Sequence, residues 1–219
     1  MMKPSMKFLL VCSLLVLVTS LTFAGIWKSR THNPYQLQDG DIVFQETNST
    51  QGKAVKAATD SRWTHVGMVF FDDGKPMVIE AVQPVRITSL NKFISRSPSS
   101  FYAMRIKDAD KHIKDDTIAK ARAYGKEQLG KNYDPQFRWS DEKIYCSELV
   151  WKIYNEATGI QLCEPRNFHS YNLNHPVVQD IVERRYGSVS NLPVDELVVA
   201  PSDLANSDLL IEAPRKLKQ

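Results

Sequence analysis

The sequence predicts an α+β fold, in which a small antiparallel sheet packs against helices. The first observation is a hairpin: apolar runs over residues 64–71 and 77–82 flank a turn centred on Asp73-Gly74, which is typical of a two-residue hairpin loop. The second is a helix over residues 145–157, where apolar side chains recur every three or four positions. A helix with one apolar stripe buries it against another element, and the sheet offers the matching apolar face.

The first part of the chain has the layout of an export segment. Two lysines precede an apolar run over residues 8–18, and Thr22 and Ala24 form a small-x-small cleavage site. We therefore expect residues 1–24 to be a signal peptide and residues 25–219 to form one domain in the periplasm or cell envelope. The apolar run can also be extended to about 20 residues, so an uncleaved N-terminal anchor close to a membrane is the alternative.

The remaining elements follow in order along the chain. Short apolar runs predict strands, and Ala- and Lys-containing stretches without proline predict helices. The tail after residue 164 is interrupted by proline and asparagine and is not expected to form a second domain. The additional elements expected are a strand at residues 42–45, a helix at 50–59, a strand at 101–107, a helix at 115–129 ended by Gly130, and a strand at 197–200.

Composition excludes several classes of function. The 219 residues carry 28 basic and 25 acidic side chains, so the net charge is only +3, and the charges are interspersed. This bias is too weak to indicate nucleic-acid binding. No internal repeat is present, so a solenoid or propeller is not expected.

Cys146 is the first candidate for chemistry because it opens the predicted helix over residues 145–157. The unpaired N–H groups and the dipole at a helix N-terminus favour a thiolate over a thiol. The same N–H groups suit a developing oxyanion. A small apolar residue of the core stripe is the structural alternative.

His65 and Glu80 are brought together by the predicted hairpin. If the turn pairs residue 72 with residue 75, the residue numbers of any two paired residues sum to 147. His65 and Glu80 are then diagonal neighbours on one face of the sheet. Gly67, opposite Glu80, leaves room for the acid. Because apolar side chains share that face, the carboxylate needs a partner, and His65 is the nearest. A carboxylate so placed would orient the imidazole as the third member of a nucleophile–base–orienter set.

Four short segments in a fixed order resemble the NlpC-type papain-like cysteine hydrolases. The cysteine helix follows the sheet here, whereas it usually precedes it, and this order is similar to the circularly permuted, YiiX-like branch. The resemblance spans residues 38–165, most of the chain after the export segment, and is expected to continue into the tail. The segments are Gly40-Asp41-Ile42-Val43-Phe44, His65-Val66-Gly67-Met68-Val69, Glu80-Ala81 and Tyr145-Cys146-Ser147-Glu148-Leu149-Val150.

The resemblance implies a permuted papain-like fold with Cys146 at the N-terminus of the central helix. It implies catalytic roles for Cys146, His65 and Glu80. It further implies that Tyr145 serves as an oxyanion or substrate contact and that Gln45 lines the cleft. Glutamate as the third residue departs from the usual histidine and fits the permuted branch.

Neither a disulfide, a metal site nor a cofactor is expected. Cys163 follows the far end of the Cys146 helix, too distant for the Cα separation that a disulfide requires. The histidines at positions 112, 169 and 175 show no zinc-ligand spacing with His65 and Cys146. No phosphate-binding glycine loop or G-x-S-x-G motif occurs.

We therefore expect an exported cysteine hydrolase that cleaves an amide through an acyl-thioester intermediate. A peptide or peptidoglycan-like substrate of the cell wall is the first expectation, and a lipid-linked small substrate is the second. A lipid-acyl hydrolase or acyltransferase using the same site is an alternative, as is a non-catalytic ligand-binding protein of the envelope. The aromatic residues Tyr133, Phe137 and Trp139 could wall an apolar pocket or belong to the core.

Overall fold

The predicted hairpin lies inside a six-stranded antiparallel sheet. The computed structural model describes residues 33–217, so the expected signal segment lies outside the described residues. Within that range the strand order is β10-β5-β1-β2-β3-β4, and every neighbouring pair is antiparallel. The sheet strands are β1 (Ile42–Gln45), β2 (His65–Asp72), β3 (Lys75–Glu80), β4 (Arg86–Ser89), β5 (Tyr102–Ile106) and β10 (Leu210–Glu212).

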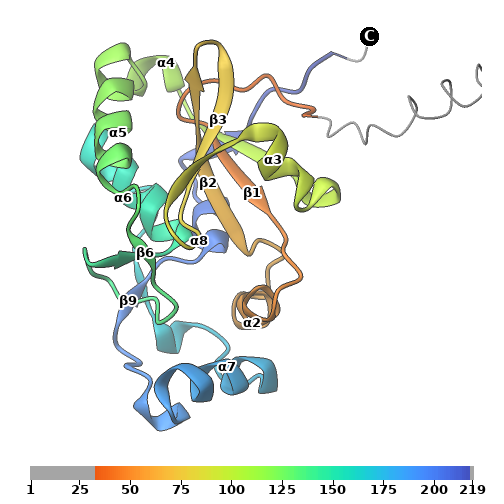
Figure 1. The fold of residues 1–219 in the computed structure, drawn as a ribbon, viewed down its shortest axis with the longest axis vertical. Coiled ribbons are helices and arrows are strands. Elements are labelled where there is room, and N and C mark those ends of the chain that lie inside the picture. The colour runs from red at the N-terminus through yellow and green to blue at the C-terminus, as the bar shows by residue number, and fades with distance from the viewer. Residues whose placement is uncertain (1–32, 218–219) are drawn as a thin grey trace, which may run out of the picture. The chain divides into compact units, whose positions relative to one another are not determined.

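Helices surround this sheet, and short strand pairs stand apart from it. Figure 1 shows α5 and α6 on one side of the sheet and α3 on the other, with α7 beyond α2. The α-helices are α2 (Thr50–Thr59), α3 (Leu90–Ser95), α4 (Ala109–His112), α5 (Asp115–Glu127), α6 (Cys146–Thr158), α7 (Pro176–Tyr186) and α8 (Pro201–Ala205). The short strands are β6 (Asn132–Tyr133), β7 (Lys143–Ile144), β8 (Arg166–Asn167) and β9 (Leu197–Val198), and 3-10 turns occupy Pro98–Ser100, Phe168–Ser170 and Val189–Asn191. The predicted α+β class is confirmed.

The hairpin has the predicted register. Met68 pairs with Ile79 and Asp72 with Lys75, so paired numbers sum to 147. Gly74 adopts a φ of 72°, the left-handed conformation that the tight turn requires and that glycine adopts without strain. The parity that brings His65 and Glu80 to one face is therefore confirmed.

Alternation along the strands gives the sheet two buried faces. On one face Phe44, Met68 and Ile79 pack in the core cluster that contains the apolar stripe of α6. On the other face Val69 and Val78 pack in a cluster with the apolar residues of α3. Burial on both faces stabilises the sheet by about 1.5–3 kcal/mol for each large apolar side chain fully removed from water.

The helix that begins at Cys146 is bounded as its sequence indicates. Tyr145 is its extended N-cap residue, and the Tyr145 N–H donates to Glu148 Oε2 at 3.3 Å. Gly159 ends the helix in the left-handed conformation, and its N–H donates to Asn155 O at 2.8 Å. These caps satisfy backbone groups that a helix end otherwise leaves unpaired.

The structure differs from the sequence expectations mainly after residue 164. The expected strand at 197–200 is the two-residue β9, and the tail also supplies the helix α7 and the sheet strand β10. Between the hairpin and β5, the short elements β4 and α3 were not predicted. Among residues 33–217, no helix has the length and apolar character needed to cross a bilayer.

Candidate active site

Cys146 is the first residue of α6, and it reaches this position through the strand β7 and the extended residue Tyr145. Its side chain is only 4% exposed and belongs to the core cluster of α6. The structural alternative, a cysteine in the apolar stripe, is thus partly correct, since the thiol is buried. It nevertheless lies at the end of the helix where backbone N–H groups are free to donate.

His65 is the first residue of the sheet strand β2. Its Nε2 lies 2.7 Å from Glu80 Oε2, so the predicted contact between the two side chains is confirmed. The imidazole also stacks on Phe93 of α3, with ring centroids 5.8 Å apart and planes inclined by 27°. Because Nε2 is bonded to Glu80, Nδ1 is the ring nitrogen left to interact with Cys146.

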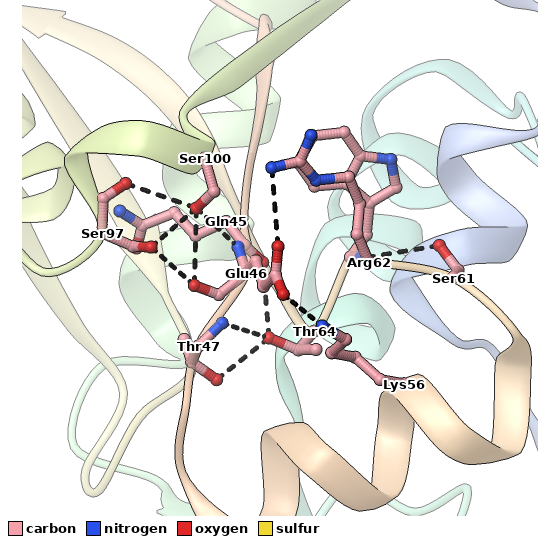
Figure 2. Close-up of polar contacts among 10 residues, drawn as sticks. Gln45, Glu46, Thr47, Lys56, Ser61, Arg62, Thr64, Ser97 and Ser100 are labelled. Carbon is pink, nitrogen blue, oxygen red and sulfur yellow. Dashed lines mark hydrogen bonds and ion pairs between the residues drawn. The ribbon is translucent and has the colours of Figure 1, made fainter.

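The backbone before His65 is fixed by a polar network that Figure 2 shows. Thr64 N–H donates to Gln45 O at 3.0 Å, and Thr64 Oγ1 accepts from Thr47 N–H at 2.7 Å. Ser97 Oγ donates to Glu46 O at 2.6 Å, which ties the end of β1 to the segment after α3. The start of β2 is thereby held against two neighbouring elements, and the imidazole is positioned with it.

Glu80 is the last residue of β3 and is fully buried. Besides His65, it accepts a hydrogen bond from Thr88 Oγ1 at 2.7 Å and one from Arg96 Nη2 at 2.6 Å. The sequence argument predicted correctly that this buried acid has a partner, but it identified only His65 and missed Thr88 and Arg96. Thr88 lies on β4, opposite Val78 of β3. Arg96 follows the short helix α3, and nothing in the local sequence indicates that its side chain reaches β3.

Gly67 provides the close approach expected of it. A Cβ atom at this position would lie 2.5 Å from Val78 Cγ1, 2.8 Å from Ile79 O and 3.4 Å from Glu80 Cβ. Real Cβ atoms essentially never approach other atoms at the two shorter distances. The absence of a side chain therefore makes room for β3 as a whole, including Glu80.

The electrostatics of the three side chains favour a thiolate–imidazolium pair. Burial opposes ionisation of Cys146, but the hydrogen bond and charge of His65, with help from the Val66 N–H, lower the thiol pKa from 9.0. Burial likewise opposes the charged form of His65, yet Cys146 and Glu80 raise its pKa to about 9. Burial would raise the pKa of Glu80, but His65 and then Arg96 hold it at about 2. An imidazolium between two anions is the arrangement that a nucleophilic cysteine requires.

A large apolar cavity, termed here the α2–α7 cavity, extends from Cys146 between α2 and α7. It holds about 830 Å³ of empty space, including the part open to solvent. Its wall includes Tyr133, Phe137 and Tyr145, so two of the three aromatic residues weighed in the sequence line it. Trp139 does not; it packs edge-on against Trp151 with centroids 5.1 Å apart.

A second and more polar hollow, termed here the polar cleft, lies on the side of His65. It holds about 970 Å³ of empty space, including open solvent. Its wall includes Thr47, Ser49, Gln83 and Arg96 beside His65. The two hollows share the lining residues Gln51, Thr64, Tyr133 and Pro135.

Gln45 and Tyr145 line the hollows beside Cys146, and each has one polar group hydrogen bonded, whereas the buried Gln45 Oε1 has no partner among the described residues. Gln45 lines the polar cleft, is fully buried and donates from Nε2 to Phe93 O at 2.6 Å. The Tyr145 hydroxyl accepts from Val199 N–H at 3.1 Å, while its ring lines the α2–α7 cavity. Burial raises the pKa of Tyr145 well above 10.0, so its hydroxyl stays neutral.

The other candidate groups are accounted for separately. Cys146 and Cys163 are both free thiols in the structure, and burial raises the pKa of the half-buried Cys163 to about 12. His175 caps α7 by accepting from the Val177 N–H.

Comparison with known proteins gives concordant results. Residues 36–211 match the family described as permuted papain-like amidase enzymes, YaeF/YiiX, the C92 family. The chain is 38% identical over 167 residues to the YiiX protein of Escherichia coli (strain K12), which covers 76% of this chain and 81% of that protein. A crystal structure from Escherichia coli O157:H7, described as the metalloprotein YiiX, superimposes with a TM-score of 0.76 at 35% identity, over 84% of this chain and all of that chain.

That relative is described as a metalloprotein. Among residues 33–217, no group of three or more His, Cys, Asp or Glu side chains is arranged to hold a metal ion. His65 Nε2 and Glu80 Oε2 are hydrogen bonded to each other, so they do not present a common vacant position to a metal ion.

With more than half of its length matched to the family and a relative of 38% identity, this chain belongs to the C92 family of permuted papain-like cysteine amidases.

Proposed function

We propose that this enzyme cleaves an amide through an acyl-thioester intermediate formed on Cys146. His65 acts as the acid and base, and Glu80 orients the imidazole and balances its charge. The proposal is supported by one arrangement above all. His65 lies between a thiol whose pKa is lowered and a buried carboxylate 2.7 Å from Nε2.

The reaction proceeds in two steps under this proposal. The Cys146 thiolate attacks the carbonyl carbon, the C–N bond breaks, and the imidazolium of His65 gives its proton to the leaving amine nitrogen. A water then attacks the thioester carbonyl as neutral His65 takes its proton, and the C–S bond breaks. The products are a free acid, an amine and the regenerated thiolate–imidazolium pair.

The oxyanion formed in each step is stabilised by backbone N–H groups at the start of α6. Cys146 and Ser147 are the first two residues of that helix, and first-turn N–H groups have no intrahelical acceptor. Tyr145 and Gln45 line the hollows beside this site. The Tyr145 hydroxyl accepts from the Val199 N–H, so its own O–H is able to donate to the oxyanion or the substrate, and Gln45 donates from Nε2 to Phe93 O.

Mass spectrometry of the intact protein tests the assignment. Incubation with a reactive acyl ester should add the acyl mass to Cys146, and hydroxylamine should remove it. Cys146→Ala should show no such adduct, whereas Cys163→Ala, the matched control, should acylate normally. An adduct on Cys163 alone, or equal labelling of the unfolded chain, would contradict the proposal. Appearance of the free acid identifies hydrolysis, and an acylated amine or alcohol would identify transfer.

We also propose that the enzyme acts outside the cytoplasm, in the periplasm or cell envelope. The support is the apolar run over residues 8–18 with its small-x-small site at Thr22 and Ala24. N-terminal sequencing of the mature protein should begin at Gly25 if the segment is cleaved. Recovery of full-length protein in the cytoplasmic fraction would contradict export, and recovery in the membrane fraction would indicate the anchor.

A further inference from the structure

We propose that the polar cleft binds a carboxylate on the leaving half of the substrate, and that Arg96 is the residue that recognises it. This inference rests on the proposed function, because it assigns a ligand to the side of the scissile bond that departs as the amine. Arg96 then determines specificity in addition to its contact with Glu80. The substrate class is an amide whose amine half is anionic.

The polar cleft lies on the leaving side of the bond. His65, which gives its proton to the departing nitrogen, lines the polar cleft. Cys146 lines the α2–α7 cavity instead, together with Ser147. A substrate with its carbonyl carbon at the sulfur and its nitrogen toward the imidazole therefore directs its amine half into the polar cleft.

Arg96 offers hydrogen-bond donors that the protein leaves unused. Its Nη2 donates to Glu80 Oε2 at 2.6 Å, and neither Nε nor Nη1 meets an acceptor among residues 33–217. The side chain is 31% exposed and lines the polar cleft beside His65. A guanidinium presents its N–H groups in a planar fork that matches the two oxygens of a carboxylate. The unused part of this fork can therefore bind a carboxylate in the cleft.

Arg96 is also held in position by the protein itself. Its Cζ lies over the ring of Phe93, 5.0 Å from the centroid, so the ring covers one face of the guanidinium. Glu80 Oε2 accepts from both Arg96 Nη2 and His65 Nε2, so these two nitrogens lie within two hydrogen-bond lengths of each other. A carboxylate bound to Arg96 therefore lies only a few atoms along the amine half from the nitrogen that leaves.

The rest of the cleft wall does not compete with the substrate for Arg96. No Asp or Glu occurs among the described residues that line it. Gln83 is engaged on both sides, because its Nε2 donates to Asn132 Oδ1 at 2.6 Å and its Oε1 accepts from Tyr133 N–H at 2.7 Å. Gln45 Oε1 is a buried acceptor without a partner among the described residues, which suits the N–H of the scissile amide. A carboxylate in the cleft is therefore left to the guanidinium.

The charges around Glu80 favour an anionic ligand at Arg96. Glu80 accepts hydrogen bonds from His65 and Thr88 as well as from Arg96, so it compensates the charge of the guanidinium only in part. A hydrogen bond between two charged groups is about twice as strong as one between neutral groups. An amine half that carries a carboxylate should therefore be preferred to its neutral isostere.

The experiment measures acylation of Cys146 by the acetyl esters of para-hydroxybenzoate and para-hydroxybenzamide. The two esters share the acyl group and the shape of the leaving group, but one carries a carboxylate where the other carries a carboxamide. Each rate is divided by that of a small thiol in solution, which removes the difference in intrinsic reactivity. We expect the corrected rate constant to be about tenfold higher for the carboxylate ester. Salt at about 0.5 M should reduce this preference, because it screens a partly exposed charge.

Three variants locate the effect. Arg96→Gln also removes a partner of Glu80, but that loss slows acylation by both esters alike and cancels in the ratio of the two rates. We therefore expect Arg96→Gln to bring the ratio to about one, and Arg96→Lys, which keeps the charge without the fork, to give an intermediate ratio. Arg86→Gln is the matched control and should keep the wild-type ratio. Arg86 is an exposed arginine opposite Glu80 on β4, outside the described wall of the cleft.

The outcomes separate this inference from the proposed function. A wild-type ratio near one, or a ratio that Arg96→Gln leaves unchanged, would overturn the inference and leave the nucleophile assignment intact. Failure of both esters to acylate Cys146 would overturn the proposed function itself. Thermal unfolding checks that each variant folds, and if Arg96→Gln does not, the wild-type ratio and Arg96→Lys still decide the matter.

Discussion

Replacing Glu80 by glutamine removes the buried charge that His65, Thr88 and Arg96 share. The fall of the Glu80 pKa from 4.5 to about 2 corresponds to roughly 3 kcal/mol in favour of the carboxylate. His65 is the largest of the interactions that favour the carboxylate. Loss of an orienting contact of about 1–2 kcal/mol lowers kcat/KM by about tenfold.

The pH profile of Cys146 alkylation by iodoacetamide gives the sharper readout. In the wild type, the thiolate–imidazolium pair exists between the lowered pKa of Cys146 and the His65 pKa of about 9. Without the carboxylate, the pKa of His65 falls, so the active range narrows from its alkaline side. A merely structural role of Glu80 would lower stability without this narrowing.

Controls make the result interpretable. Glu212→Gln removes an exposed carboxylate from another strand of the same sheet and should leave the profile unchanged. Urea denaturation checks that Glu80→Gln is folded under the assay conditions. A folded Glu80→Gln protein with the wild-type rate and the wild-type profile would refute the assignment of Glu80 as the orienting group.

Three further predictions follow from the same contacts. His65→Ala removes the main cause that lowers the Cys146 pKa, so burial raises that pKa above 9.0, and alkylation at pH 7 should slow by about 100-fold or more. The melting temperature should fall as well, because buried Glu80 loses a hydrogen-bond partner. Arg96→Gln, at a side chain 31% exposed, should lower kcat/KM for a substrate with an uncharged leaving group by only about threefold, and a loss as large as that of Glu80→Gln would contradict this ranking. Gly67→Ala should lower the free energy of unfolding in urea by about 2 kcal/mol because the backbone at Ile79 O cannot yield. Gly125→Ala, whose Cβ meets only the side-chain ends Ile79 Cδ1 and Ile153 Cδ1, should cost less than about 1 kcal/mol. Equal losses at the two glycines would contradict the argument.

The catalytic half of the fold could be predicted from sequence because its signals are local. Asp73-Gly74 fixes the hairpin parity, and parity alone brings His65 and Glu80 to one face. The spacing from Cys146 to Ala157 defines both the helix and its buried side. The hairpin parity does not predict the long-range contact between Cys146 and His65, because that contact depends on how α6 packs on the sheet.

The tail could not be predicted in the same way. Pro176 was read as an interruption, but it stands at the first turn of α7, where proline is favoured, behind the cap residue His175. The strand β10 has only three residues, and its identity comes from pairing with β5, more than 100 positions earlier. The partners Thr88 and Arg96 were missed for the same reason, since each reaches Glu80 across an element boundary.

The helix α7 packs chiefly on α2, and together they form the wall of the cavity that leads to Cys146. The sheet strands that carry His65 and Glu80 take little part in that wall. Substitutions in α7 can therefore change the room offered to a substrate while the reactive groups keep their geometry. Descendants of one ancestral enzyme can in this way inherit the same chemistry and diverge in what they accept.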